Sequence, residues 1–168
     1  LRIRGDIYLS QGDFSTALTD QQTALSIARE LDDLDDVAYS LQALGQTYET
    51  LGQPDQAIPL YQEGLQIFKE IGSATGQAAI YNTLGNSASI QENYADALNY
   101  YQQALDIYKT VGAVGAEALT LTNIGYAQYN LNNLDIAQDV FTQALTIQRR
   151  IGRASDMGAS LKGLGLVA

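Results

Sequence analysis

Glycine recurs every forty residues along the chain, at Gly5, Gly45, Gly85, Gly125 and Gly165. A large aromatic residue follows three of these glycines at one fixed distance, as Tyr61, Tyr101 and Phe141, and Gln21 fills this position in the first unit. A fixed period of this length indicates a repeat protein, in which one unit cannot bury its apolar side alone and must stack on the next. We therefore expect an array of stacked units rather than a closed globule.

Each unit is predicted to form two helices. Leu41, Leu44 and Tyr48 follow the 3.6-residue period of one helical stripe. Gly52 then favours the end of this helix and Pro54 the start of the next. We find no sustained alternation of apolar and polar residues that would indicate strands. The predicted fold class is all-α.

The second helix of a unit is expected to end at a glycine, namely Gly72, Gly112 or Gly152. In the first unit Asp32 takes this place, because a short polar side chain tolerates left-handed backbone better than most. Pro59 conflicts with a helix that opens near Pro54, since proline kinks a helix unless it lies in the first turn. We expect small residues such as Gly45 and Ala57 where the two helices approach closely.

The amino-acid composition excludes most common catalytic and metal-binding chemistry. The 168 residues contain no cysteine, histidine or tryptophan, which excludes disulfides, zinc sites with Cys or His ligands, and nucleophiles that depend on those residues. At 46% apolar and 17% charged, the chain is too apolar to be disordered. We expect no enzymatic activity, no cofactor and no metal.

The net charge of −10 disfavours nucleic acids and anionic membrane surfaces as partners. No apolar run approaches the 18 or more residues of a membrane span, and the chain opens at Leu1 without a signal peptide. We interpret the chain as a soluble, cytoplasmic piece of a larger protein.

The phrase Leu44, Gly45 and Tyr48, followed by Ala57 and Tyr61, resembles the tetratricopeptide repeat. Its forty-residue units are similar to those of kinesin light chains, Pins-type adaptors and bacterial multi-repeat proteins. The resemblance implies a right-handed superhelical solenoid of antiparallel helix pairs, with about nine helices including partial terminal ones. It also implies one array over residues 1–168, with repeats of approximately 1–35, 36–75, 76–115, 116–155 and 156–168.

The same resemblance implies a function. In this family the first helices line a concave groove that holds a protein or peptide, so we expect a bacterial, cytoplasmic interaction scaffold. Two alternatives stay open. The array could be a structural or self-assembling spacer, or a ligand-sensing module that regulates an attached signalling enzyme.

A second stripe on the first helix lies about 140° from the core stripe and should face away from the paired helix. Its amide and phenol groups suit the backbone of an extended peptide, although polar residues can equally be merely solvated. The expected partner-binding residues are Gln42, Gln46 and Glu49, then Asn82, Asn86 and Ser89, then Thr122, Asn123, Tyr126, Tyr129 and Asn130.

Two ligand classes are not expected on this face. Chaperone-binding relatives hold a carboxylate with basic residues, whereas the matching positions here are Gln42, Asn82 and Thr122. Glu49 and Asp6 are the acidic candidates on the face, and nothing places them as an acid and base pair.

Two charged clusters have simple interpretations. Asp32, Asp33, Asp35 and Asp36 could suggest calcium, but the loop lacks the glycine and distal glutamate of an EF-hand. We favour a solvated turn in which one aspartate caps the next helix. The cluster Arg149, Arg150 and Arg153 suits the negative end of a helix dipole, with a phosphate or acidic partner as the alternative.

The terminal helices are incomplete units. The first begins only four residues before Gly5, and the last carries Leu161, Leu164 and Leu166 without a partner helix. Solenoids usually need a terminal repeat with a polar outer face. We expect either a cut from a longer array or end-to-end self-association through these helices.

Overall fold

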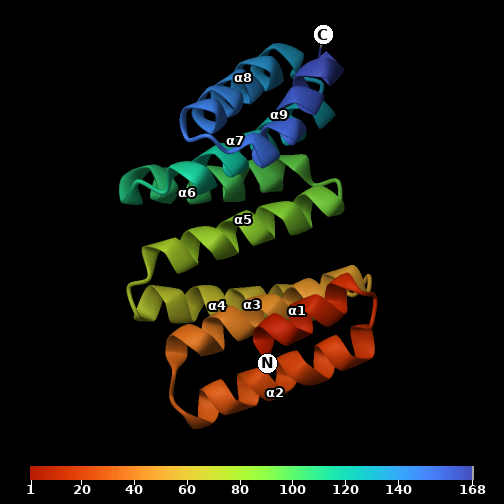
Figure 1. Ribbon diagram of the computed structural model, residues 1–168, viewed down its shortest axis with the longest axis vertical. Coiled ribbons are helices and arrows are strands. Elements are labelled where there is room, and N and C mark those ends of the chain that lie inside the picture. The colour runs from red at the N-terminus through yellow and green to blue at the C-terminus, as the bar shows by residue number, and fades with distance from the viewer. Residues whose placement is uncertain (168) are drawn as a thin grey trace. The chain divides into compact units, whose positions relative to one another are not determined.

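The computed structural model describes residues 1–167, which form nine α-helices and no strand (Figure 1). The all-α prediction is confirmed. The helices are α1 (Arg2–Ser10), α2 (Phe14–Glu30), α3 (Leu34–Thr50), α4 (Pro54–Glu70), α5 (Ala74–Ile90), α6 (Tyr94–Val111), α7 (Val114–Asn130), α8 (Leu134–Arg150) and α9 (Ala154–Val167).

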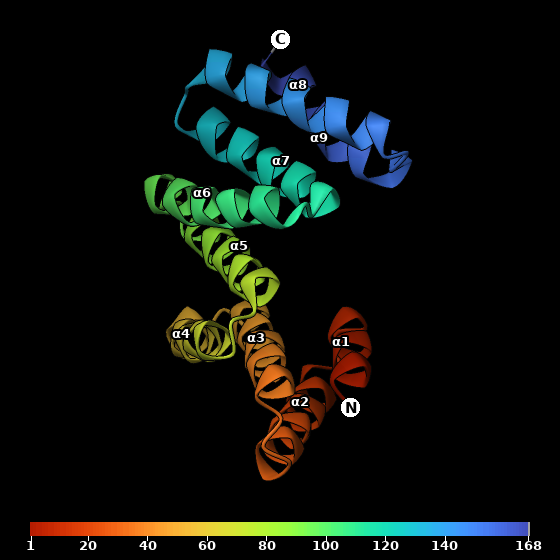
Figure 2. The same cartoon turned by 90° about the vertical axis from the view of Figure 1, so that its left-hand side faces the viewer.

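Short turns join successive helices, as Figure 2 shows for the antiparallel pair α7 and α8. Each turn contains one residue with left-handed backbone. Gly52 has a φ of 71°, and Asp32 reaches 53° at the position that glycine fills in the later repeats, as predicted. Asp33 then caps α3, because its side chain accepts a hydrogen bond from the Asp36 amide at 3.0 Å. The predicted capping role of the aspartate-rich turn is confirmed.

Proline opens α4 at Pro54, as predicted, and Pro59 lies inside the same helix. A proline at this point is past the first turn and removes one backbone donor from the helix. The conflict found in the sequence is therefore present in the structure, and α4 nevertheless continues to Glu70.

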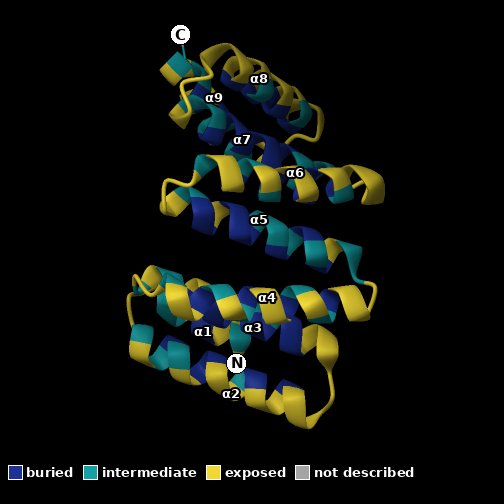
Figure 3. Cartoon of the chain, turned by 180° about the vertical axis from the view of Figure 1, so that it is seen from behind, coloured by how far each residue is buried: buried dark blue, intermediate teal, exposed yellow. Residues whose placement is uncertain are grey.

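The chain divides into two compact units, each larger than one forty-residue repeat: the N-terminal unit, Leu1–Ile80, and the C-terminal unit, Tyr81–Ala168. In the N-terminal unit, the apolar faces of α2 and α3 form a core of Leu25, Ala28, Val37, Leu41 and Leu44. Buried residues gather on one side of these helices, while the turns are exposed (Figure 3).

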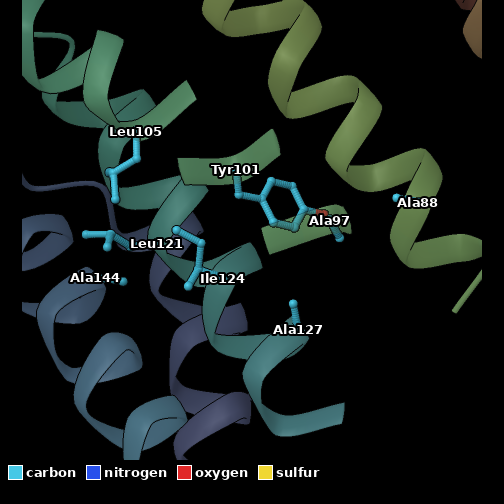
Figure 4. Close-up of a cluster of buried hydrophobic side chains, with 8 residues drawn as sticks. All are labelled: Ala88, Ala97, Tyr101, Leu105, Leu121, Ile124, Ala127 and Ala144. Carbon is cyan, nitrogen blue, oxygen red and sulfur yellow. The ribbon is translucent and has the colours of Figure 1, made fainter. Parts of the chain in front are cut away.

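The C-terminal unit has a core built from α5 to α8, in which Tyr101 on α6 points toward α5 (Figure 4). The cluster buries one aromatic ring together with aliphatic and small residues from four helices. Its members are Ala88, Ala97, Tyr101, Leu105, Leu121, Ile124, Ala127 and Ala144.

The recurring glycines are packing sites for the recurring aromatic rings. A Cβ on Gly125 would lie 2.6 Å from Phe141 Cε1, and one on Gly45 or Gly85 would collide with Tyr61 or Tyr101. Real Cβ atoms do not approach so closely in a close-packed interior. The predicted close approach of the two helices at these positions is therefore confirmed.

Candidate functional site on the first helices

The first helices of the N-terminal unit, α1 and α3, line a small, open polar pocket. Its volume is about 180 Å³, and both Gln42 and Gln46 line it as the stripe predicted. The complete lining is Arg2 and Asp6 from α1 with Tyr39, Gln42, Ala43 and Gln46 from α3. Tyr39 and Ala43 belong to this face although the predicted stripe did not include them.

Glu49, the third residue predicted on this face of α3, is bonded to the buried Tyr61 of α4. It is half-buried, and its carboxylate accepts a hydrogen bond from the Tyr61 hydroxyl at 2.9 Å. Burial raises the pKa of Tyr61 well above its usual range, and the neighbouring Glu49 charge raises it further. Tyr61 is therefore a neutral donor that fixes the Glu49 side chain.

A series of side-chain hydrogen bonds also fixes the position of Asp6. The Thr47 hydroxyl donates to Gln21 Oε1 at 2.7 Å, which fixes the direction of the Gln21 amide. Gln21 Nε2 then donates to Asp6 Oδ1 at 3.3 Å. The polar Gln21, placed where other units have an aromatic ring, thus positions an acidic residue of the pocket.

Arg2 brings to this face a base that was not predicted from the sequence. It lies forty residues before Gln42, so the repeat register alone was a signal that could have found it. Its guanidinium carbon lies 5.1 Å from the centre of the Tyr39 ring, within cation–π range. Arg2 Nη1 also lies 3.7 Å from Asp36 Oδ1.

In the C-terminal unit, three asparagines from α5 and α7 form a network. Asn123 Nδ2 donates to Asn82 Oδ1 at 3.4 Å and to Asn86 Oδ1 at 3.2 Å. The Thr120 hydroxyl lies 3.3 Å from Asn82 Oδ1 and 2.9 Å from the Ala116 carbonyl, so its one proton is shared between these two acceptors. The structure thus brings together Asn82, Asn86 and Asn123, which the sequence predicted on one face.

A buried tyrosine extends this network into the core. The Tyr101 hydroxyl donates to Asn86 Oδ1 at 2.8 Å, and the Ser89 hydroxyl lies 3.2 Å away. Because Tyr101 has a single proton and gives it to Asn86, Ser89 is the donor in the second bond. Burial raises the pKa of Tyr101, so this donor stays protonated.

The network determines which amide atoms stay available. Asn86 Oδ1 accepts from both Tyr101 and Asn123, and its Nδ2 makes no hydrogen bond within residues 1–167. Asn123 uses both hydrogens of Nδ2, which leaves its Oδ1 as an acceptor. The face therefore offers a donor at Asn86 and an acceptor at Asn123.

Thr122 does not belong to this accessible face. The structure buries it to 3% exposure between α7, α8 and α9. Its hydroxyl lies 3.0 Å from the Ala118 carbonyl and 2.8 Å from the Ser160 hydroxyl, and Gln148 Nε2 donates to it at 3.4 Å. The expectation for Thr122 is wrong because α9 covers this side of α7, which a single-helix projection ignores.

Tyr126 and Tyr129 are half-buried rather than fully exposed. The Tyr126 ring meets Phe141 edge to face at 5.0 Å, and its hydroxyl donates to the Ala159 carbonyl at 2.7 Å. Burial raises the pKa of Tyr126. Asn130 remains exposed and donates to the Tyr126 carbonyl at 2.8 Å.

Comparison with known families agrees with the helix pairs and their glycine contacts. The sequence profile of the tetratricopeptide repeat matches residues 1–70 and 76–150. The chain belongs to the tetratricopeptide repeat family.

Solved structures share this tetratricopeptide fold. BtubC (BKLC) from P. vanneervenii is 26% identical, with a TM-score of 0.85 over 97% of this chain and 68% of that one. A putative kinesin light chain with nearly identical TPR-like repeats from Podosopora anserina is 15% identical, with a TM-score of 0.78 over 99% and 82%.

A Rap protein solved in complex with competence and sporulation factor is 16% identical, with a TM-score of 0.82. The match covers 97% of this chain and 46% of that one. This tetratricopeptide repeat chain therefore spans less than half of the Rap protein and about two thirds of BtubC. No curated protein matches its sequence.

Three other features of the tetratricopeptide repeat chain concern metal, phosphate and membrane binding. Within the described residues, no group of three acidic, histidine or cysteine side chains is placed to hold a metal, including the aspartate-rich turn. Arg149 and Arg150 lie exposed in the last turn of α8, and Arg153 pairs with Asp156 at 3.3 Å. None of the helices in residues 1–167 is long and apolar enough to cross a membrane.

Proposed function

We propose that this chain is a protein-interaction module that binds an extended peptide segment of a partner along its first helices. The observation that carries the proposal is the pair formed by Asn86 and Asn123. One presents an unused amide donor and the other an unused amide oxygen, both on the same face of the C-terminal unit. An extended backbone needs this combination, because each of its residues offers one donor and one acceptor.

The rigidity of the amides supports this proposal. Asn86 is held by Tyr101 from the core, and Asn123 is held by two asparagines. Binding groups that are fixed before the ligand arrives lose less conformational entropy on binding. A merely solvated surface has no need for such fixation.

The relatives are consistent with this role. A Rap protein of the same fold was solved with competence and sporulation factor bound. Tetratricopeptide arrays are scaffolds rather than catalysts as a rule, and we extend this non-enzymatic role to the present chain. The proposal also treats residues 1–168 as one cytoplasmic array whose partner is a protein or peptide.

The experiment selects ligands from a phage library of random linear octapeptides and measures the affinity of the best binder for two variants. The variant Asn86→Asp keeps an oxygen that accepts from Tyr101 and Asn123 but replaces the outward amide donor with an acceptor. We expect at least about a tenfold loss of affinity, since one hydrogen bond becomes a repulsion between acceptors.

Asn99→Asp is the matched control, because it makes the same charge change on the exposed surface of α6. Affinity should be unchanged in this variant, and both variants should melt cooperatively. Enrichment of no peptide, or equal losses in the two variants, would contradict binding along the first helices. The structural spacer would then be the better interpretation.

A further inference from the structure

We propose that the pocket between α1 and α3 is a specificity site for a carboxamide side chain, asparagine or glutamine, of a peptide bound to the N-terminal unit. This inference rests on the proposed function and names the chemistry that the N-terminal unit would select. It follows from the size of the pocket, from one donor-only group and one acceptor-only group in its wall, and from the amides between them.

The size of the pocket suits a single side chain of the ligand. Its volume of about 180 Å³ is below the roughly 300–1,000 Å³ of pockets that enclose drug-sized ligands. Ala43 supplies a small residue to the lining where α7 has Asn123 at the same repeat position. The amide of Asn123 bonds across to α5, whereas Ala43 has no side-chain group that could bridge to α1 in this way.

Arg2 is the donor in the wall. A guanidinium has five N–H donors and no acceptor, and Arg2 makes no hydrogen bond within the described residues. Its contacts are the Tyr39 ring at 5.1 Å and Asp36, 3.7 Å from Nη1. Nη1 is itself enclosed, so the remaining N–H groups are the ones that a ligand oxygen would meet.

Asp6 is the acceptor in the wall. Its carboxylate is exposed and uses Oδ1 to accept from Gln21 Nε2 at 3.3 Å. An ionised carboxylate accepts several hydrogen bonds and donates none. Asp6 lies four residues after Arg2 on α1, so the two groups stand on the same face of the helix.

Only a dipolar ligand satisfies both groups. A carboxylate would pair with Arg2 but be repelled by Asp6, and an ammonium group would meet the reverse problem. An apolar side chain would remove water from both charged groups without replacing its hydrogen bonds. A carboxamide donates from its nitrogen and accepts at its oxygen, and Gln46 supplies a further amide beside it.

The experiment measures binding of four capped pentapeptides to the full chain by NMR. Each probe has four alanines around a central glutamine, glutamate, lysine or leucine. We expect the glutamine peptide to shift the backbone amide resonances of Gln42, Ala43 and Gln46 at the lowest concentration. Its affinity should exceed that of the other three by about tenfold or more, equivalent to one well-made hydrogen bond.

Two variants should change the preference in opposite directions. Asp6→Asn replaces the acceptor with a donor and should move the preference from glutamine to glutamate. Arg2→Gln removes the positive charge and should move it toward lysine. Asp35→Asn, an exposed residue outside the pocket, is the control and should leave the ranking unchanged.

Three outcomes overturn the proposal: no peptide shifts the three resonances, leucine binds as well as glutamine, or both pocket variants keep the original ranking. These outcomes are separate from a failure of the proposed function, which is tested at Asn86 in the other unit. If Asn86→Asp lost octapeptide binding but the pocket showed no preference among the four pentapeptides, only this inference would be wrong. A selective pocket without any selected octapeptide would remove the proposed function alone.

Discussion

The Tyr101 hydroxyl donates a hydrogen bond of 2.8 Å to Asn86 Oδ1, which joins a buried core residue to the candidate binding face. Tyr101 is only 2% exposed, whereas Asn86 lies exposed on α5. The direction of this bond fixes the amide of Asn86 with its nitrogen outward. Packing of the hairpin and the chemistry of the face are therefore coupled through one phenol.

Replacing Tyr101 with phenylalanine tests this coupling. The ring can still pack, because Phe141 occupies the same repeat position next to Gly125. Loss of the hydroxyl should lower the free energy of unfolding by about 0.5–1.5 kcal/mol and release the Asn86 amide. Urea denaturation and octapeptide affinity measure the two effects.

The affinity should fall more in Tyr101→Phe than in Tyr100→Phe, a half-buried tyrosine on the same helix whose hydroxyl makes no hydrogen bond to Asn86 within the described residues. Equal affinities in the two variants would show that the Asn86 amide does not depend on Tyr101.

Adding one methyl group at Gly85 should destabilise the C-terminal unit. A Cβ there would collide with the Tyr101 ring, and overpacking of a core costs about 1–3 kcal/mol. Gly158→Ala on α9 is the matched change, because nothing lies within 4 Å of its added Cβ. Because alanine has a higher helix propensity than glycine, this change should raise the free energy of unfolding by about 0.5–1 kcal/mol, and the melting temperature with it. The same sign of change in both variants, measured by thermal unfolding, would refute the packing argument.

The sequence predicted the helix pairs because their signals are local. Gly52 and Pro54 mark a turn through backbone preferences alone, and α3 and α4 meet there as expected. The contact between Gly45 and Tyr61 was also predictable, since the glycine and the ring recur together in every complete unit.

The binding face was only partly predictable because neighbouring first helices also contact one another. A projection of one helix placed Thr122 outside, yet α9 covers it. The same projection left out Tyr39 and Ala43, which line the pocket only because α1 lies opposite. Such contacts depend on the angle between successive repeats. The residue pattern of a single helix does not contain this angle.

Gln148 on α8 offers a stabilising substitution. It is fully buried, and its Oε1 has no hydrogen-bond partner within the described residues. Its single donated bond, to Thr122, is long at 3.4 Å, and Thr122 keeps its contact with Ser160. An unsatisfied buried oxygen costs about 1–3 kcal/mol, so Gln148→Met should stabilise the protein by about 1 kcal/mol. A lower denaturation midpoint in urea would contradict this, and Gln143→Met, on the exposed side of α8, is the control.

The ion pair between Arg4 and Asp20 should make the free energy of unfolding depend on pH in the acid range. Arg4 donates two bonds of 2.5 Å to the Asp20 carboxylate, whose side chain is only 7% exposed. The bonded guanidinium lowers the pKa of Asp20 below its ordinary value. A carboxyl with a lowered pKa in the folded state stabilises the protein above its unfolded pKa of about 3.9, and this contribution is lost as the pH falls through the folded pKa.

Arg4→Met should therefore be less stable than the wild type near neutral pH, and the difference should shrink below about pH 4. Denaturation in urea across this range measures the difference. The same substitution in an Asp20→Asn background isolates the pair, since the double-mutant cycle removes effects that do not involve Asp20. If the coupling between the two residues were constant from pH 7 to acid, the Asp20 charge would not be its source.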